Sequence, residues 1–225
     1  MTSPLSPEKS GIQSFQNDIE YLTAEFEWMR VRARRIEFQR ELEEQSGAAS
    51  KRYNWRGRSI QPPITADMVA CLQEQESVLR RGIDARLEMN RGAGPALGLD
   101  KACVEFHLNS FERHILLLAT LPCFGSNASL QTISRVDPTQ SAGSIYLEIV
   151  SLFLELPPAE HLQMMQSILP TAPLRTNRLI HLMYDPFTPG DSLGVSIDLT
   201  GAALAGITSI AAFRGFAAPA EKGEG

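Results

Sequence analysis

Three residues that can bind a metal ion recur at helical spacing in the middle of the chain. Cys103 and His107 are four residues apart, and His114 follows seven residues later, so one face of a helix would carry all three. A zinc site needs four ligands, and the sequence offers no Cys-x-x-Cys pair or second paired element to complete one. We therefore expect these side chains to be core residues with polar edges, and we expect neither a metal nor another cofactor.

The other candidates for catalysis also lack the residues that would have to act with them. Ser192 stands beside Asp191 in a predicted turn, a pairing that is common in turns, and His161 and His181 have no evident Ser or Cys partner. A phosphate-binding loop needs glycines with a Lys and a Ser or Thr at the start of a helix. The glycines of Lys222–Gly225 have no helix after them, and those of Gly92–Gly98 follow a helix rather than a strand. We expect no enzymatic activity.

A short stretch alternates basic and aromatic side chains between two predicted helices. Its candidate contact residues for nucleic acid or a protein partner are Arg52, Tyr53, Trp55, Arg56 and Arg58. Such residues can stack on bases and neutralise phosphates of single-stranded nucleic acid. The alternative is a linker loop whose Trp55 docks on the core while the arginines remain in solvent. The acidic net charge of −5 favours the alternative.

The composition is that of an ordinary globular chain. It has 225 residues, of which 43% are hydrophobic and 21% charged, and this length indicates one large domain or two small ones. No apolar run approaches the roughly 20 residues that span a bilayer. Three widely spaced cysteines, Cys71, Cys103 and Cys123, are typical of free thiols in a reducing compartment. We expect a cytoplasmic protein that does not bind membranes.

A regular apolar repeat marks the first long helix. The spacings alternate between four and three residues, which is the pattern of a narrow seam between two helices. This N-terminal seam consists of Phe15, Ile19, Leu22, Phe26, Met29, Ala33 and Ile36. Either the helix lies on its own domain, or it pairs as a coiled coil with another chain or with the following helix. We predict that this seam binds a protein partner or forms a homo-oligomer.

The predicted elements divide the chain into a helical arm and a second, more apolar half. We expect a disordered lead over residues 1–13, a helical arm or hairpin over 14–98 with a linker at 46–63, a winged-helix-like domain over 99–213 and a disordered tail over 214–225. Ser14 and Thr65 are the predicted N-caps of the two arm helices. The second of these helices would fold back on the first.

The second half contains the element order of a winged helix. The predicted elements are helices at 103–118, 137–156, 158–169 and 202–212, and a β-hairpin of 179–184 with 194–199. The third helix has Leu162, Met165 and Ile168 as its apolar positions. The expected fold is therefore mainly α with a small β-hairpin, in which a long N-terminal helix or helical hairpin precedes a winged-helix-like domain.

The third helix of a winged helix normally enters the major groove of DNA with basic or amide side chains. Here the predicted third helix, 158–169, contains no Arg or Lys, and the predicted wing tip, 185–191, is acidic. Only Arg175 and Arg178 lie at the base of the hairpin. Because phosphate neutralisation supplies most of the affinity for DNA, these features favour a protein partner, with a DNA-binding regulator as the alternative.

Several short segments resemble a bacterial protein family. They are Trp55-Arg56-Gly57, the helix start at Ile64, Phe111-Glu112-Arg113, Tyr146-Leu147-Glu148-Ile149 and Asp198-Leu199. Together they resemble the N-terminal, winged-helix-containing region of the AAA+ ATPases of extracellular contractile injection systems, over most of residues 15–212. In that family an ATPase module with a phosphate-binding loop follows, and this sequence has no such module.

The resemblance implies a non-catalytic part that recognises partners. We expect a protein–protein interaction module that is accessory to the assembly or remodelling of a phage-tail-like injection particle. The implied partner is an AAA+ ATPase or a component of the particle. ATP hydrolysis is not implied, because no residue matches the phosphate-binding positions of the family.

Overall fold

The computed structural model describes residues 13–47, 63–124, 131–132, 135–136, 145–184 and 195–208. The predicted lead up to residue 12, the basic-aromatic loop at 52–58, the wing tip at 185–191 and the tail lie outside these residues. Within the described residues, no helix combines the length and apolar character that crossing a membrane requires.

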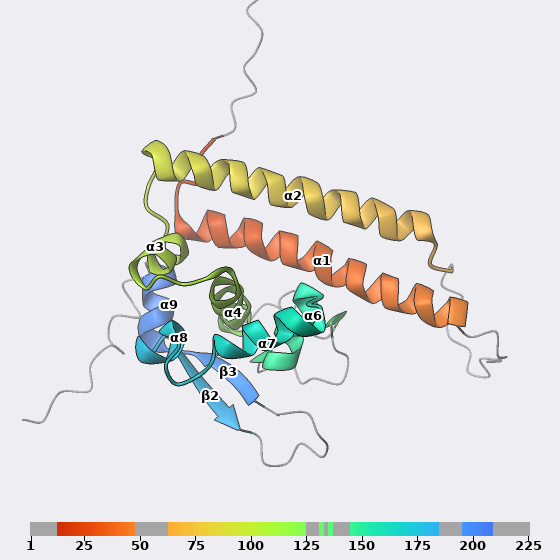
Figure 1. The fold of residues 1–225 in the computed structure, drawn as a ribbon. Helices are drawn as coiled ribbons and strands as arrows, with labels where there is room; N and C mark the ends of the chain where they lie inside the picture. Colours follow the sequence, from red (N-terminus) through yellow and green to blue (C-terminus); the bar gives the residue numbers. More distant parts are fainter. Residues whose placement is uncertain are drawn as a thin grey trace, which may run out of the picture.

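Two long antiparallel helices, α1 (Asp18–Gly47) and α2 (Ala66–Ala93), form a hairpin along one side of the molecule (Figure 1). The Thr65 side chain caps α2 by accepting a hydrogen bond from the Met68 backbone N–H, which confirms that predicted cap. Ser14 is not the cap of α1, because the helix begins at Asp18 and the Asn17 side chain accepts a hydrogen bond from the Glu20 backbone N–H at 2.9 Å. Side-chain capping satisfies an N–H group that has no partner within the helix.

The N-terminal seam packs inside this chain. Phe15, Leu22, Met29 and Ala33 are buried in the core, and Phe26 and Ile36 are partly buried against it. Ile19 is the one member of the seam whose side chain is mostly exposed, at 57%. The helix therefore lies on its own domain and also pairs with the following helix, α2, as both interpretations of the repeat allowed. The buried members are not available to a second protein. Partner binding through this seam stays a prediction, in which Ile19 would be the exposed contact residue.

One helix predicted for the middle of the chain is in fact two. Residues 103–118 are divided between α3 (Gly98–Glu105) and α4 (Ser110–Thr120). His107 between them has a φ of 53°, and Asn109 with Glu112 forms a capping box at the start of α4. The Asn side chain and the Glu side chain each satisfy a backbone N–H of the other residue, which makes a new helix start more favourable than continuation of the old one.

The rest of the described chain builds the winged helix around α4. The 3₁₀ turn η1 (Leu121–Phe124) is followed by β1 (Ile145–Tyr146), α6 (Leu147–Leu154), α7 (Pro158–Gln166), α8 (Pro173–Thr176), β2 (Ile180–Tyr184), β3 (Val195–Leu199) and α9 (Gly201–Thr208). The strands form an antiparallel sheet in the order β1-β3-β2, with Leu182 opposite Ile197. The predicted hairpin is confirmed.

The predicted helix at 137–156 is wrong at its start, because Ile145 and Tyr146 form a strand and α6 begins at Leu147. Residues 137–144 of that helix lie outside the described residues. The third helix, predicted over 158–169, ends at Gln166. The final helix, predicted to reach residue 212, is described as far as Thr208.

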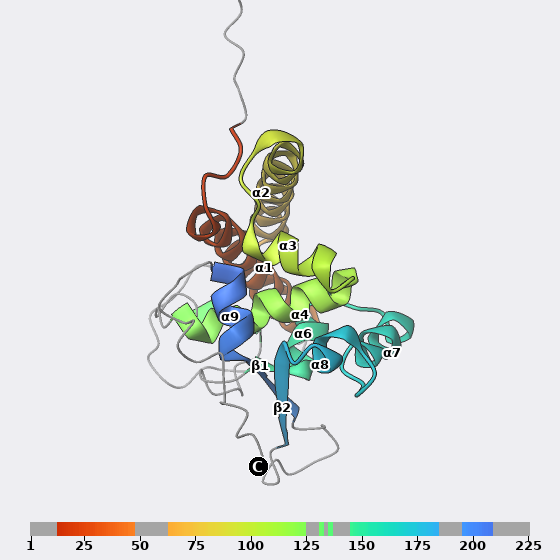
Figure 2. The same cartoon turned by 90° about the vertical axis from the view of Figure 1, so that its left-hand side faces the viewer.

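The hairpin and the winged helix share one hydrophobic core. A single cluster of buried residues extends from Phe15, which precedes α1, and Met29 on α1 through Leu117 on α4 to Ile197 on β3 and Ile207 on α9. Figure 2 shows α4 in the middle of this arrangement, with α9 and α6 beside it. The arm therefore packs on the second half of the chain.

A fully buried carboxylate joins three of these helices. Glu25 on α1 accepts a hydrogen bond from Arg80 on α2 at 2.9 Å and another from Arg113 on α4. Arg113 also donates to the Tyr21 hydroxyl at 2.6 Å. Burial, reinforced by the charge of Glu25, raises the pKa of Tyr21, so the hydroxyl stays neutral. A buried charge is tolerated only where opposite charges and hydrogen bonds compensate for its lost hydration.

Replacing Glu25 by Gln should destabilise the fold strongly, because it leaves the guanidinium groups of Arg80 and Arg113 without their shared counter-charge. We expect a loss of about 3 kcal/mol in the free energy of unfolding, measured by urea denaturation followed by circular dichroism. Glu27→Gln is the control, since its ion pair with Arg30 is exposed and should be worth less than about 0.5 kcal/mol. Equal effects of the two substitutions would contradict this account of Glu25.

Candidate interaction surface of the winged helix

The turn between α6 and α7 sets the position of the helix that follows it. Glu155 ends α6 in the left-handed conformation, with φ 53° and ψ 45°. The backbone N–H of Leu156 then donates to the Ser151 carbonyl at 3.2 Å, which satisfies a carbonyl at the helix end. Pro158 begins α7 at its first turn, where the missing N–H of proline costs nothing.

Helix α1 holds this turn in place. Arg32 donates through Nε to the Phe153 carbonyl at 2.6 Å, and Arg35 donates to the Glu155 carboxylate at 3.0 Å. Arg35 also binds Glu76 on α2 at 2.6 Å. Burial alone would raise the pKa of Glu155, but the hydrogen bonds and charges of Arg35 and Arg32 outweigh it and lower that pKa. The turn is thus tied to both helices of the hairpin.

Helix α7 lies on the side of the molecule away from α2 (Figures 1 and 2). Four of its exposed residues share one face at helical spacing; this α7 face consists of Ala159, Leu162, Gln163 and Gln166. Leu162 is 68% exposed, whereas Met164 is fully buried. The inward positions of the helix are therefore Met164 and the half-buried Met165, and Leu162, which the sequence pattern grouped with the apolar side, points to solvent.

The α7 face is surrounded by few positive charges. No Lys or Arg occurs between Leu147 and Gln166, while Glu148, Glu155 and Glu160 do. The nearest cations that follow in the sequence are Arg175 and the exposed Arg178. A winged helix that binds DNA gains affinity by neutralising phosphates, and this surface offers little for that purpose.

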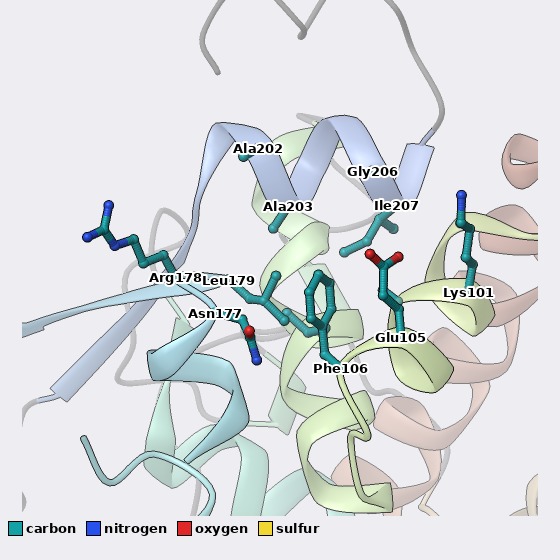
Figure 3. A pocket seen from close by; sticks show the side chains of 13 residues that line it. Lys101, Glu105, Phe106, Asn177, Arg178, Leu179, Ala202, Ala203, Gly206 and Ile207 are labelled. Atoms are coloured by element: carbon teal, nitrogen blue, oxygen red, sulfur yellow. The ribbon is translucent and has the colours of Figure 1, made fainter. Parts of the chain in front are cut away.

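A second candidate site is a cleft of about 250 Å³ between α3, α9 and the start of β2. Figure 3 shows Phe106 and Leu179 between α3 and α9, with Glu105 at the edge and Arg178 directed away. The lining is mostly apolar, and Lys101 is its other charged residue besides Glu105 and Arg178. The cleft can take an apolar group of modest size. Its lining carries no nucleophile with an adjacent base.

The three candidate metal ligands are not brought together. Cys103 lies on α3, His107 is exposed in the turn, and His114 lies on α4 with its Nδ1 2.7 Å from the Ser110 carbonyl oxygen. Burial raises the pKa of Cys103 to about 11 and lowers the pKa of His114 to about 4. Among the residues that the structure describes, no group of three or more ligand-type side chains could hold a metal ion.

Close packing of α3 on α9 leaves room at Gly98 for hydrogen only. A Cβ atom there would lie 2.3 Å from the Gly206 carbonyl oxygen, whereas a Cβ at Gly206 would meet nothing within 4 Å.

We expect Gly98→Ala to cost about 1–3 kcal/mol of stability by forcing the helices apart. Gly206→Ala, the matched control on the same cleft, should be neutral or stabilising by up to about 1 kcal/mol. Thermal and urea unfolding measure both, and a tolerated Gly98→Ala would show that the helices are not in close contact.

The chain was compared with known proteins in three ways. A family model described as "winged helix domain, variant" matches residues 3–201, which include the helical hairpin, the helix-turn-helix formed by α6 and α7, and the sheet. The searches of curated proteins and of solved structures each returned no match. Nothing in these findings connects the chain to the ATPases of contractile injection systems. The match extends over most of the sequence, and the chain therefore belongs to the variant winged helix domain family.

Proposed function

We propose that this chain is a non-catalytic protein–protein interaction module that binds its partner through the α7 face. The observation that carries the proposal is Leu162, which is 68% exposed in the middle of the helix that normally reads DNA. An exposed leucine flanked by small and amide side chains is suited to an apolar groove on another protein. The proposal treats the chain as non-catalytic because its sequence lacks a phosphate-binding loop, a catalytic triad and a metal motif.

The bracing of the turn supports recognition by a preformed surface. Because Arg32 and Arg35 fix the end of α6, α7 is presented in one orientation before any partner arrives. Preorganisation reduces the entropy that binding must overcome. Trp28 on α1 adds to this support by packing edge-on against Phe153, with the ring centroids 5.7 Å apart.

The proposed identity of the partner rests on the sequence resemblance alone. That resemblance suggests an AAA+ ATPase or another component of a contractile injection system, with this chain as an accessory to assembly or remodelling. In this setting the chain would act in the cytoplasm.

The alternative function is sequence-specific DNA binding. It is favoured by Gln163 and Gln166, which lie four and seven residues after Ala159 on the exposed α7 face, because glutamine can bind an adenine edge in the major groove with two hydrogen bonds. It is disfavoured by the missing cations on α6 and α7. DNA binding would then depend on cations of other segments, such as the exposed Arg178.

A photo-cross-linking amino acid at position 162 tests the proposal in cells. We expect it to capture a protein, which mass spectrometry identifies. In titration calorimetry with that purified partner, Leu162→Glu should weaken binding by at least tenfold, because burial of a leucine is worth about 1.5–3 kcal/mol.

Val104→Glu is the matched control, because Val104 on α3 is an exposed aliphatic residue of the same kind, at 69%. It should bind the partner as the unchanged chain does. Capture of DNA at position 162 would support the alternative. Equal loss of binding in both variants would contradict a role for the α7 face.

A further inference from the structure

Helix α2 carries a second seam on its outer side, which is uncharged and apolar except for Gln75. Its seven positions are separated by three and four residues in strict alternation; this outer seam consists of Met68, Cys71, Gln75, Val78, Gly82, Ala85 and Met89. The large members are well exposed: Met68 at 36%, Val78 at 51% and Met89 at 44%. Cys71 is an exposed free thiol. The spacing is that of a helix-to-helix contact.

The outer seam is separate from the side of α2 that packs on α1. That inner side contains the buried Glu76, Ile83 and Leu87, and it accounts for the hairpin. The outer seam is displaced by about 100° around the helix and contains no charged residue. None of the residues that the structure describes covers it, and a Cβ placed at Gly82 would meet nothing within 4 Å.

We propose that the outer seam is a dimer interface, through which α2 of one copy of this chain pairs with α2 of a second copy in antiparallel orientation. Antiparallel pairing centred between Gln75 and Val78, which leaves Met89 of each copy beyond the last layer, sets Met68 and Cys71 against small residues. Met68 then lies opposite Ala85 of the second copy, and Cys71 lies opposite Gly82. A parallel pairing in register would instead place Gly82 against Gly82 and Met89 against Met89, which leaves a gap at one layer and crowding at another.

The charges beside the seam select the same pairing. Glu74 and Arg81 lie on one flank, where they form an exposed ion pair with each other at 3.2 Å, and their side chains are both 72% exposed. In the antiparallel register, Glu74 of each copy also faces Arg81 of the other, so the two ion pairs within the chains join into one network of four alternating charges. A register shifted by one heptad would set Arg81 against Arg81. The pairing also brings Asp67 of each copy near Glu88 of the other at the exposed ends, where salt screens the repulsion. The flanking charges therefore select the register of the two helices and add little to the affinity of the dimer.

Disulfide cross-linking tests the orientation. The background is the full chain with Cys103→Ser and Cys123→Ser, so that Cys71 is the remaining cysteine. With Gly82→Cys added, mild oxidation should produce a covalent dimer, because the two cysteines of opposite copies face each other. In the background alone, the two Cys71 residues would be about 16 Å apart along the helix axis, beyond the roughly 7 Å limit for a disulfide.

Two cross-linking controls complete this test. Cys71→Ser combined with Gly82→Cys should give no covalent dimer, since both kinds of cysteine are required. A covalent dimer in the background with Cys71 alone would show a parallel arrangement and would overturn the proposal. No cross-link in any variant would overturn it as well.

Sedimentation equilibrium of the full chain tests the interface itself. We expect reversible association to twice the chain mass of 24.8 kDa. Val78→Asp should raise the dissociation constant at least tenfold, whereas Ser77→Asp, which adds the same charge at an exposed position beside the seam, should leave it unchanged. Circular dichroism confirms that both variants fold. A monomer at all concentrations, or a dimer that Val78→Asp does not weaken, would overturn the proposal.

The dimer does not depend on the proposed function of the α7 face. Leu162→Glu should leave the dissociation constant of the dimer unchanged, and Val78→Asp should leave the α7 face intact. Failure of one proposal is therefore distinguishable from failure of the other.

Discussion

Burial of the apolar side of α1 is the constraint on which the rest of the structure depends. The helix supplies Leu22 and Met29, and the segment just before it supplies Phe15, to the same core that contains the inner side of the winged helix. On its polar flank Glu25 is enclosed by arginines from α2 and α4. Because α1 contributes both apolar area and a compensated charge, the winged helix is built around it, and the hairpin is a structural part of the domain.

This arrangement decides which surfaces remain for other molecules. The N-terminal seam is largely used within the chain, and the arginines of α1 that lie near the helix-turn-helix are engaged with Phe153, Glu76 and Glu155. Among the surfaces of the described residues that stay exposed are the neutral α7 face on one side and the outer seam of α2 on the other. Both are better suited to proteins than to a polyanion, which is why our two proposals concern protein contacts on separate faces.

The sequence predicted the fold class because apolar patterns that repeat over many consecutive residues are strong signals of secondary structure. The repeat of Phe15 to Ile36 predicted a long helix, and the alternating runs on either side of the wing predicted the hairpin. Short-range decisions were harder. The break between α3 and α4 depends on the reciprocal cap of Asn109 and Glu112, and that motif was present in the sequence. The strand at Ile145 is only two residues long, too short for any periodicity.

The candidate site was less predictable than the fold. A seam of strict spacing indicates a helix contact but does not reveal whether the contact is within one chain or between two. For a short helix such as α7, the inward side depends on where Pro158 starts the helix and on how the preceding turn is held, so Leu162 and Met164 could not be distinguished by pattern. Arg32, Arg35 and Glu155 act through contacts between residues about 120 positions apart, which leave no local signal.

Native-state hydrogen exchange tests most directly whether α1 belongs to the domain core. If it does, amides in the middle of α1, around Leu22 and Met29, should exchange only through global unfolding, with the same free energy as amides around Leu116 and Leu117 on α4. Exchange in α1 at a free energy several kcal/mol lower, while α4 stays protected, would show that the hairpin opens on its own and would contradict this account.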